Sequence, residues 1–131
     1  PRGVIIMGRI LIVLAALITM GTAANAATTL AAGGIFAGTT QNTAVCYLYN
    51  AGNSAVSVRG SIVQQFIGPV PLTVNQCGAP LAAGAICGIA AKAVNNAPYA
   101  CKFVISPDGA AVRGALELRN GLTVLKNVEL R

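Results

Sequence analysis

The chain has 131 residues and a formal net charge of +6, with no histidine and only three Asp and Glu residues. The absence of histidine excludes Ser–His and Cys–His nucleophile systems and imidazole metal ligands. Three scattered carboxylates are a poor basis for a paired-carboxylate glycosidase. Tryptophan is absent and aromatic residues make up 5% of the chain, which argues against nucleic-acid recognition by base stacking. We therefore expect one non-enzymatic domain with no cofactor, no metal site and no nucleic-acid partner.

Residues 1–26 have the pattern of a cleavable signal peptide. Arg2 and Arg9 form a basic start, a short apolar stretch follows, and Ala24-Asn25-Ala26 supplies the small-x-small cleavage pattern. The stretch is shorter than the roughly 20 residues that a membrane-spanning helix needs, which disfavours the alternative of an uncleaved anchor. Residues 1–6 are open to interpretation as an upstream gene-calling extension. We expect a secreted or periplasmic protein, with no transmembrane span after cleavage.

Residues 27–42 are rich in alanine, glycine and threonine, and we expect a flexible lead-in with one weak edge strand. Residues 43–49 alternate as a firm strand. Its predicted core-facing residues are Ala44, Cys46 and Leu48, and its outward row is Val45, Tyr47 and Tyr49. Aromatic rows on a sheet face often mark interaction sites, so this row is a candidate binding surface. The alternative is that residues 30–36 of the lead-in cover it.

Residues 55–67 form a predicted long strand, with Gly60 as a bulge or bend, and the turn residues of 68–71 end it. A second hairpin is predicted where Cys77 and Cys87 flank a segment containing proline and glycine, followed by an alternating run. A disulfide across this hairpin would stabilise the fold by about 2–3 kcal/mol, because it closes a loop of the unfolded chain.

The spacing Cys77-x3-Leu81-x2-Gly84-x2-Cys87 resembles the immunoglobulin-like domains of bacterial secreted proteins, of the abnormal-spindle/hydin type. Tyr99, two residues before Cys101, matches the tyrosine corner of immunoglobulin sandwiches, whose hydroxyl bonds backbone a few residues upstream. The alternative is an ordinary buried tyrosine. Four cysteines allow three connectivities. The resemblance to immunoglobulin sandwiches implies an inter-sheet bridge Cys46–Cys101 together with Cys77–Cys87, which suits an oxidising compartment.

Apolar and polar residues alternate regularly over 99–105, 112–118 and 122–128. A four-residue turn at 106–109 predicts a hairpin that keeps apolar residues together. Its pairs are Ile105 with Ala110, Phe103 with Val112 and Lys102 with Arg113. A three-residue loop at 119–121 predicts the next hairpin, because a one-residue slip would turn its apolar side chains outward. Its pairs are Leu118 with Leu122, Leu116 with Val124 and Val112 with Val128.

These registers place basic side chains together on an outer face. Lys102 would lie opposite Arg113, and Arg119 would extend them into a patch that touches phosphate or carboxylate groups of the envelope. The alternative is a surface pair between Arg113 and Glu129, worth at most about 1 kcal/mol.

The elements together predict an all-β chain, with an immunoglobulin-like antiparallel two-sheet sandwich of about seven or eight strands over 43–131. Two function classes fit it. The first is a structural or binding module that contacts another envelope or extracellular protein through a sheet face or loops. The second is a small cationic, disulfide-stapled effector or inhibitor that acts on an anionic envelope target.

Overall fold

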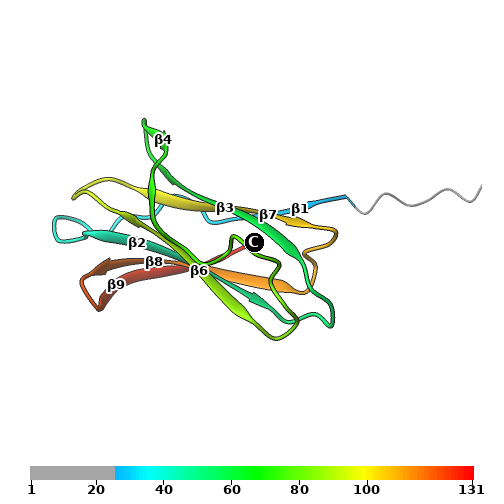
Figure 1. Ribbon diagram of the computed structural model, residues 1–131. Coiled ribbons are helices and arrows are strands. Elements are labelled where there is room, and N and C mark those ends of the chain that lie inside the picture. The colour runs from blue at the N-terminus through cyan, green and yellow to red at the C-terminus, as the bar shows by residue number, and fades with distance from the viewer. Residues whose placement is uncertain (1–25) are drawn as a thin grey trace, which may run out of the picture.

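A computed structural model describes residues 26–131 as an all-β chain folded into two antiparallel sheets packed face to face (Figure 1). The predicted fold class is confirmed. Apart from Ala26, the predicted signal peptide lies outside the described residues.

Nine strands make up the described part of the chain, in place of the predicted seven or eight. The lead-in contributes β1, and the turn residues at 68–71 contribute the two-residue β4. The strands are β1 (Thr28–Ala31), β2 (Thr43–Asn50), β3 (Ser57–Gln64), β4 (Gly68–Pro69), β5 (Leu72–Asn75), β6 (Ile86–Lys92), β7 (Tyr99–Ser106), β8 (Val112–Asn120) and β9 (Thr123–Leu130).

The strands form a four-stranded sheet in the order β1-β7-β3-β4 and a five-stranded sheet in the order β5-β6-β2-β8-β9. In an immunoglobulin constant-type sandwich, strands A, B, E and D form one sheet, and C, F and G form the other. Strands β2, β3, β5, β6 and β7 take the places of B, C, D, E and F. The terminal strands are exchanged, because β1 lies beside β7 where G would lie, and β8 lies beside β2 where A would lie.

The inner faces of both sheets form one core. Alternation along β2 and β7 buries every second residue: Ala44, Cys46, Leu48, Tyr99, Cys101, Phe103 and Ile105 are at most 1% exposed. The disulfide Cys46–Cys101 joins these two strands, with 6.1 Å between the Cα atoms, and so links the sheets through the middle of the core.

Gly60 lies inside β3, where the predicted bulge or bend is wrong. It pairs in register with Phe103 of β7. A Cβ atom at Gly60 would lie 2.5 Å from Cε1 of Phe103 and 2.8 Å from Cδ1 of Ile89. Glycine is required here because the Phe103 ring fills the space that a side chain would occupy.

The predicted hairpin after Cys101 is also wrong, because β7 and β8 belong to different sheets. Its three predicted pairs, Ile105–Ala110, Phe103–Val112 and Lys102–Arg113, do not form. Both edges of β7 are already occupied, by β1 on one side and β3 on the other. The loop between β7 and β8 therefore crosses between the sheets, where Thr28 Oγ1 accepts a hydrogen bond from the backbone N of Gly109 at 3.0 Å.

The β8–β9 hairpin differs from the predicted register as well. Asn120 pairs with Thr123 across a two-residue turn, and Leu125 is an extra residue that shifts the register. Such a bulge changes which side chains face inward. Before it, Leu122 and Val124 are 95% and 43% exposed, whereas after it Val128 and Leu130 pack against the core. The predicted pairs Leu118–Leu122, Leu116–Val124 and Val112–Val128 are therefore wrong.

Candidate functional site

The outer face of the five-stranded sheet gathers most of the predicted binding residues. We call it the outer tyrosine face, and its members are Val45, Tyr47 and Tyr49 of β2, Ile86 of β6, Arg113, Ala115, Glu117 and Arg119 of β8, and Glu129 of β9. The register brings them together, because β2 is flanked by β6 and β8 and its outward residues alternate with the core residues. Exposure rises along β2: Val45 is buried, Tyr47 is half-buried and Tyr49 is 43% exposed.

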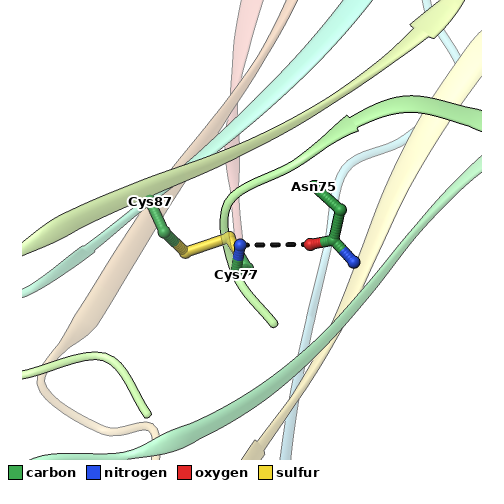
Figure 2. Close-up of a disulfide and its surroundings, with 3 residues drawn as sticks. All are labelled: Asn75, Cys77 and Cys87. Atoms are coloured by element: carbon green, nitrogen blue, oxygen red, sulfur yellow. Dashed lines mark hydrogen bonds between the residues drawn. A yellow bond between two sulfur atoms is a disulfide. The ribbon is translucent and has the colours of Figure 1, made fainter. Parts of the chain in front are cut away.

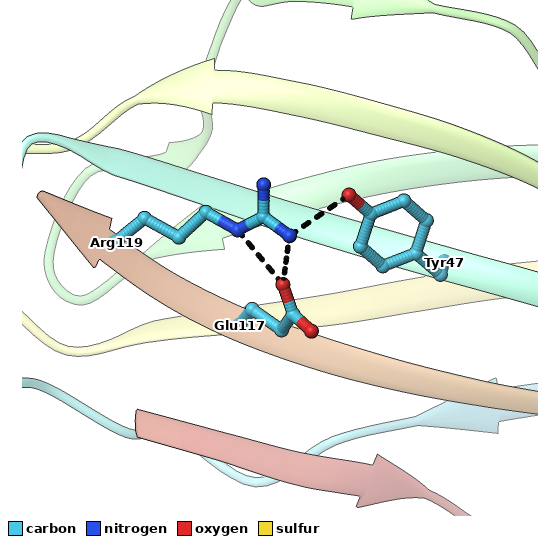
Figure 3. Close-up of polar contacts among 3 residues, drawn as sticks. All are labelled: Tyr47, Glu117 and Arg119. Carbon is cyan, nitrogen blue, oxygen red and sulfur yellow. Dashed lines mark hydrogen bonds and ion pairs between the residues drawn. The ribbon is translucent and has the colours of Figure 1, made fainter. Parts of the chain in front are cut away.

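A polar cluster of Tyr47, Glu117 and Arg119 lies at one side of this face (Figure 3). Nε of Arg119 donates to Oε2 of Glu117 at 2.8 Å, and Nη2 donates to the same oxygen and, at 3.1 Å, to the hydroxyl of Tyr47. The Arg119 guanidinium carbon also lies 5.7 Å from the centre of the Tyr47 ring. The hydrogen bond to Glu117 raises the pKa of Arg119 above its ordinary value. Arg119 is therefore engaged within the protein, and it holds the Tyr47 ring in place.

The sheet makes room for the Tyr47 ring with small neighbours. Gly88 of β6 and Ala115 of β8 lie opposite Tyr47 on its two sides. A Cβ atom at Gly88 would lie 3.2 Å from Cδ1 and Cε1 of Tyr47, which is tighter than ordinary van der Waals contact. Because these neighbours are small, the Tyr47 ring lies close to the sheet. It does not cover the end of the face at Tyr49.

An open, shallow depression of about 640 Å³ lies at that end, and its walls are mainly apolar. Tyr49 and Ile86, which pair across β2 and β6, line it with exposed fractions of 43% and 68%. Arg113 and Glu129 contribute one charge of each sign to the same lining. Nη1 of Arg113 donates to the carbonyl oxygens of Ala110, at 2.8 Å, and Val112, at 2.9 Å, which ties the guanidinium to its own strand.

Among residues 26–131 the one ion pair is Glu117–Arg119, so the predicted surface pair between Arg113 and Glu129 is not formed. The predicted basic patch of Lys102, Arg113 and Arg119 is wrong too. Lys102 lies on the other sheet, between Ala31 of β1 and Ser61 of β3. Arg119 is paired with Glu117.

The lead-in does not cover the tyrosine row, so that alternative is wrong. Strand β1 pairs with β7 at the edge of the four-stranded sheet. Leu30 packs against the core between the sheets. The outer tyrosine face is therefore open to solvent at Tyr49 and Ile86.

Both disulfides have the connectivity that the sequence analysis favoured. Besides Cys46–Cys101, Cys77 bonds Cys87 with 5.2 Å between the Cα atoms, and the backbone N of Cys77 donates to Oδ1 of Asn75 at 3.1 Å (Figure 2). No cysteine from residue 26 onward is free. Two disulfides indicate an oxidising, extracellular or periplasmic environment.

Tyr99 has the contacts of a tyrosine corner. Its buried hydroxyl accepts a hydrogen bond from the backbone N of Val94, five residues upstream, at 2.8 Å, and donates to Oε1 of Gln64 at 3.0 Å. The hydroxyl thereby fixes the loop that leads into β7.

Two buried polar residues were not foreseen from the sequence. Nδ2 of Asn50 donates to the carbonyl oxygens of Ser54 and Leu81, at 2.8 and 3.1 Å. Nε2 of Gln41 donates to the carbonyl oxygens of Val94 and Ala97, at 2.7 and 2.6 Å. Each joins loops that are far apart in the sequence, which local patterns do not reveal. Their side chains have structural roles.

Within the described residues, no three His, Cys, Asp or Glu side chains are grouped so that they could hold a metal ion. That part of the chain also contains no helix long and apolar enough to cross a membrane. Comparison of the chain with models of protein families, with curated proteins and with solved structures gave no match.

Proposed function

We propose that this chain is an exported, non-enzymatic binding module that docks a protein partner through the outer tyrosine face. The observation that carries the proposal is the depression beside Tyr49. There, an exposed tyrosine and an exposed isoleucine lie beside two charges of opposite sign, Arg113 on β8 and Glu129 on β9. Tyrosine and arginine are common anchors of protein interfaces.

The platform beneath this depression is preorganised. β2 is the central strand of the five-stranded sheet, and Cys46 on its inner side ties it to the other sheet. On its outer side, Arg119 and Glu117 hold the Tyr47 ring. A rigid surface loses little conformational entropy when it binds, which leaves more of the contact energy for affinity.

The size of the face limits the strength of the complex. Four strands of seven to nine residues and one strand of four, spaced about 4.8 Å apart, offer roughly 600 Å². Each partner in a standard protein–protein interface contributes about 800 Å². We therefore expect a complex of moderate area, in which Tyr49 and Ile86 carry much of the affinity.

Export is supported by two independent features. Residues 1–26 have the charge, apolar stretch and cleavage pattern of a signal peptide, and both disulfides suit an oxidising compartment. We propose that the module acts in the periplasm or outside the cell. The spacing from Cys77 to Cys87, which resembles immunoglobulin-like domains of bacterial secreted proteins, supports the same location.

Affinity capture from a detergent-solubilised envelope extract tests the proposal. Wild-type protein should retain a specific partner that the Tyr49→Ser/Ile86→Ser variant loses. The matched control is Lys102→Ser, because Lys102 is exposed on the opposite sheet and belongs to neither proposed surface. A partner that is retained equally by all three proteins would contradict the proposed surface.

A further inference from the structure

Four loops meet at one end of the sandwich, and we call this the loop end. They are the loops 36–42, 65–67, 93–98 and 121–122. The register places them together, because the start of β2 pairs with the end of β6 and the end of β8, and the end of β3 pairs with the start of β7. In Figure 1 this is the left end, and the tip of the β3–β4 hairpin rises above the body of the molecule.

Large apolar side chains are exposed at the tips of this end. Phe66 and Leu122 are each 95% exposed, and Ile67 is 68% exposed. Phe36, Val94 and Val124 lie around them with 43–49% exposure. The other large apolar residues that are exposed on the described chain, Tyr49, Val74 and Ile86, lie on strands of the five-stranded sheet. The loop end is therefore a second apolar surface, made of separate projecting tips.

The backbone at Phe66 indicates that its side chain is held there at a cost. Phe66 has a φ of 64°, in the left-handed region that a bulky residue seldom adopts. Its side chain makes almost no contact with the fold, since it is 95% exposed. Glycine or asparagine would fit this backbone better. A strained, exposed phenylalanine without a packing role points to a role in binding.

The charges around these tips are almost all positive. Lys92 lies at the end of β6 and Lys126 on β9, and Nζ of Lys126 lies 5.5 Å from the centre of the Phe36 ring. The carboxylate nearest to them in the sheet, Glu117, is engaged by Arg119. Asp108 lies in the loop between β7 and β8 at the opposite end of the sandwich. The loop end thus combines projecting apolar tips with lysines and no unpaired carboxylate.

We propose that the loop end inserts into the interface of an anionic lipid bilayer. Phe66, Ile67 and Leu122 would enter the boundary between headgroups and acyl chains, and Lys92 and Lys126 would contact the anionic headgroups. Separate tips suit a fluid lipid surface, because lipids rearrange around each inserted side chain and no fixed shape has to be matched. A protein partner would instead require one continuous, complementary patch.

Single-tryptophan fluorescence tests the insertion directly, because the chain contains no tryptophan. The Phe66→Trp variant is mixed with vesicles of phosphatidylethanolamine and phosphatidylglycerol. Its emission should shift to shorter wavelength and should be quenched by lipids that carry a quencher in their acyl chains. Tyr49→Trp, on the outer tyrosine face, is the matched control and should show neither effect. Equal shifts at both positions, or no shift at Phe66→Trp, would overturn the proposal.

Vesicle sedimentation gives the energetic test. Replacing both tips in Phe66→Gly/Leu122→Ser should weaken binding at least about tenfold, because two apolar side chains no longer leave water. Thermal unfolding should show a melting temperature equal to or above that of the wild type, since glycine relieves the backbone at position 66. Lys92→Gln/Lys126→Gln should weaken binding about 25-fold, or about fivefold for each lysine. This loss should disappear on phosphatidylcholine vesicles and shrink at high salt.

The Tyr49→Ser/Ile86→Ser variant should bind vesicles like the wild type, which separates this surface from the proposed protein-binding face. Binding that survives in Phe66→Gly/Leu122→Ser would overturn the proposal. Analytical ultracentrifugation tests the alternative occupant, a second copy of the chain. The lipid proposal is wrong if the wild type self-associates, Phe66→Gly/Leu122→Ser stays monomeric, and neither protein binds vesicles. The loop end would then be a contact between copies of the chain.

Discussion

The two disulfides should contribute unequally to stability, and the structure sets the order. Cys46–Cys101 spans a sequence separation of 55 residues, and Cys77–Cys87 spans 10. In the chain-entropy model, the long loop destabilises the unfolded state by about 4 kcal/mol and the short one by about 3 kcal/mol. Replacing each pair by two alanines should reveal this difference.

Packing adds to both losses, because all four cysteines belong to the core and are at most 4% exposed. Cys46 and Cys101 are 0% and 1% exposed and lie between the two sheets. Removing each of these sulfur atoms leaves a small void that costs about 0.5–1.5 kcal/mol. The Cys46→Ala/Cys101→Ala variant should therefore lose about 5–7 kcal/mol, a large part of the roughly 5–15 kcal/mol that a domain of this size has.

Urea unfolding followed by circular dichroism measures both effects. Cys77→Ala/Cys87→Ala should be the less destabilised variant, with a free energy of unfolding lower by about 4–6 kcal/mol, because its shorter loop adds about 3 kcal/mol to the same void cost. Cys46→Ala/Cys101→Ala should be largely unfolded or close to it at 25 °C. Equal losses in the two variants, or a larger loss in Cys77→Ala/Cys87→Ala, would show that the inter-sheet bridge does not have the role described here.

Three single substitutions test the packing and hydrogen bonds around this core. Gly60→Ala should lower the free energy of unfolding by about 1–3 kcal/mol, because its methyl group would overlap the Phe103 ring. Adding Phe103→Leu should recover part of that loss in a double-mutant cycle, and additive losses would refute the contact. Tyr99→Phe should cost about 1–3 kcal/mol, since the backbone N of Val94 loses its acceptor, and hydrogen exchange at that amide should accelerate, whereas unchanged protection would argue against the tyrosine corner. Asn50→Ala should destabilise the fold by a similar amount, about 1–3 kcal/mol, measured as a lower urea midpoint. A midpoint equal to that of the wild type would contradict the role of Asn50 in joining the loops.

The strands and their faces could be predicted from the sequence because their signals are local. Alternation from Thr43 to Tyr49 depends on neighbouring residues alone, and it correctly separated the buried Cys46 and Leu48 from Tyr49. Spacing and the likeness to immunoglobulin sandwiches likewise led to the observed disulfide pairs.

The sheet to which each strand belongs could not be predicted in the same way. The turn residues at 106–109 suit a hairpin, but they also suit a crossing between sheets, and competition from β1 for the edge of β7 decides between them. That competition involves residues about 75 positions apart and leaves no local trace. The predicted patch of Lys102 and Arg113 depended on this hairpin, so it was wrong for the same reason.

The predicted β8–β9 register was wrong for a related reason. The prediction assumed regular pairing without a bulge, which places Leu122 and Val124 on the inner face. In the structure, Leu125 is an extra residue in β9, and Leu122 and Val124 are exposed. The partnership of Glu117 with Arg119 was accessible from the sequence, because residues two apart on a strand share a face. The contact of Arg119 with Tyr47 required the knowledge that β8 lies beside β2.

Site-specific photo-crosslinking tests the proposed binding function most directly. A photoreactive phenylalanine is placed at Tyr49, on the outer tyrosine face, or at Lys102, which is exposed on the opposite sheet. On irradiation in the producing cell, Tyr49 should yield one discrete protein adduct that Lys102 does not. No adduct at Tyr49, or the same adducts at both positions, would contradict a docking site on the outer tyrosine face.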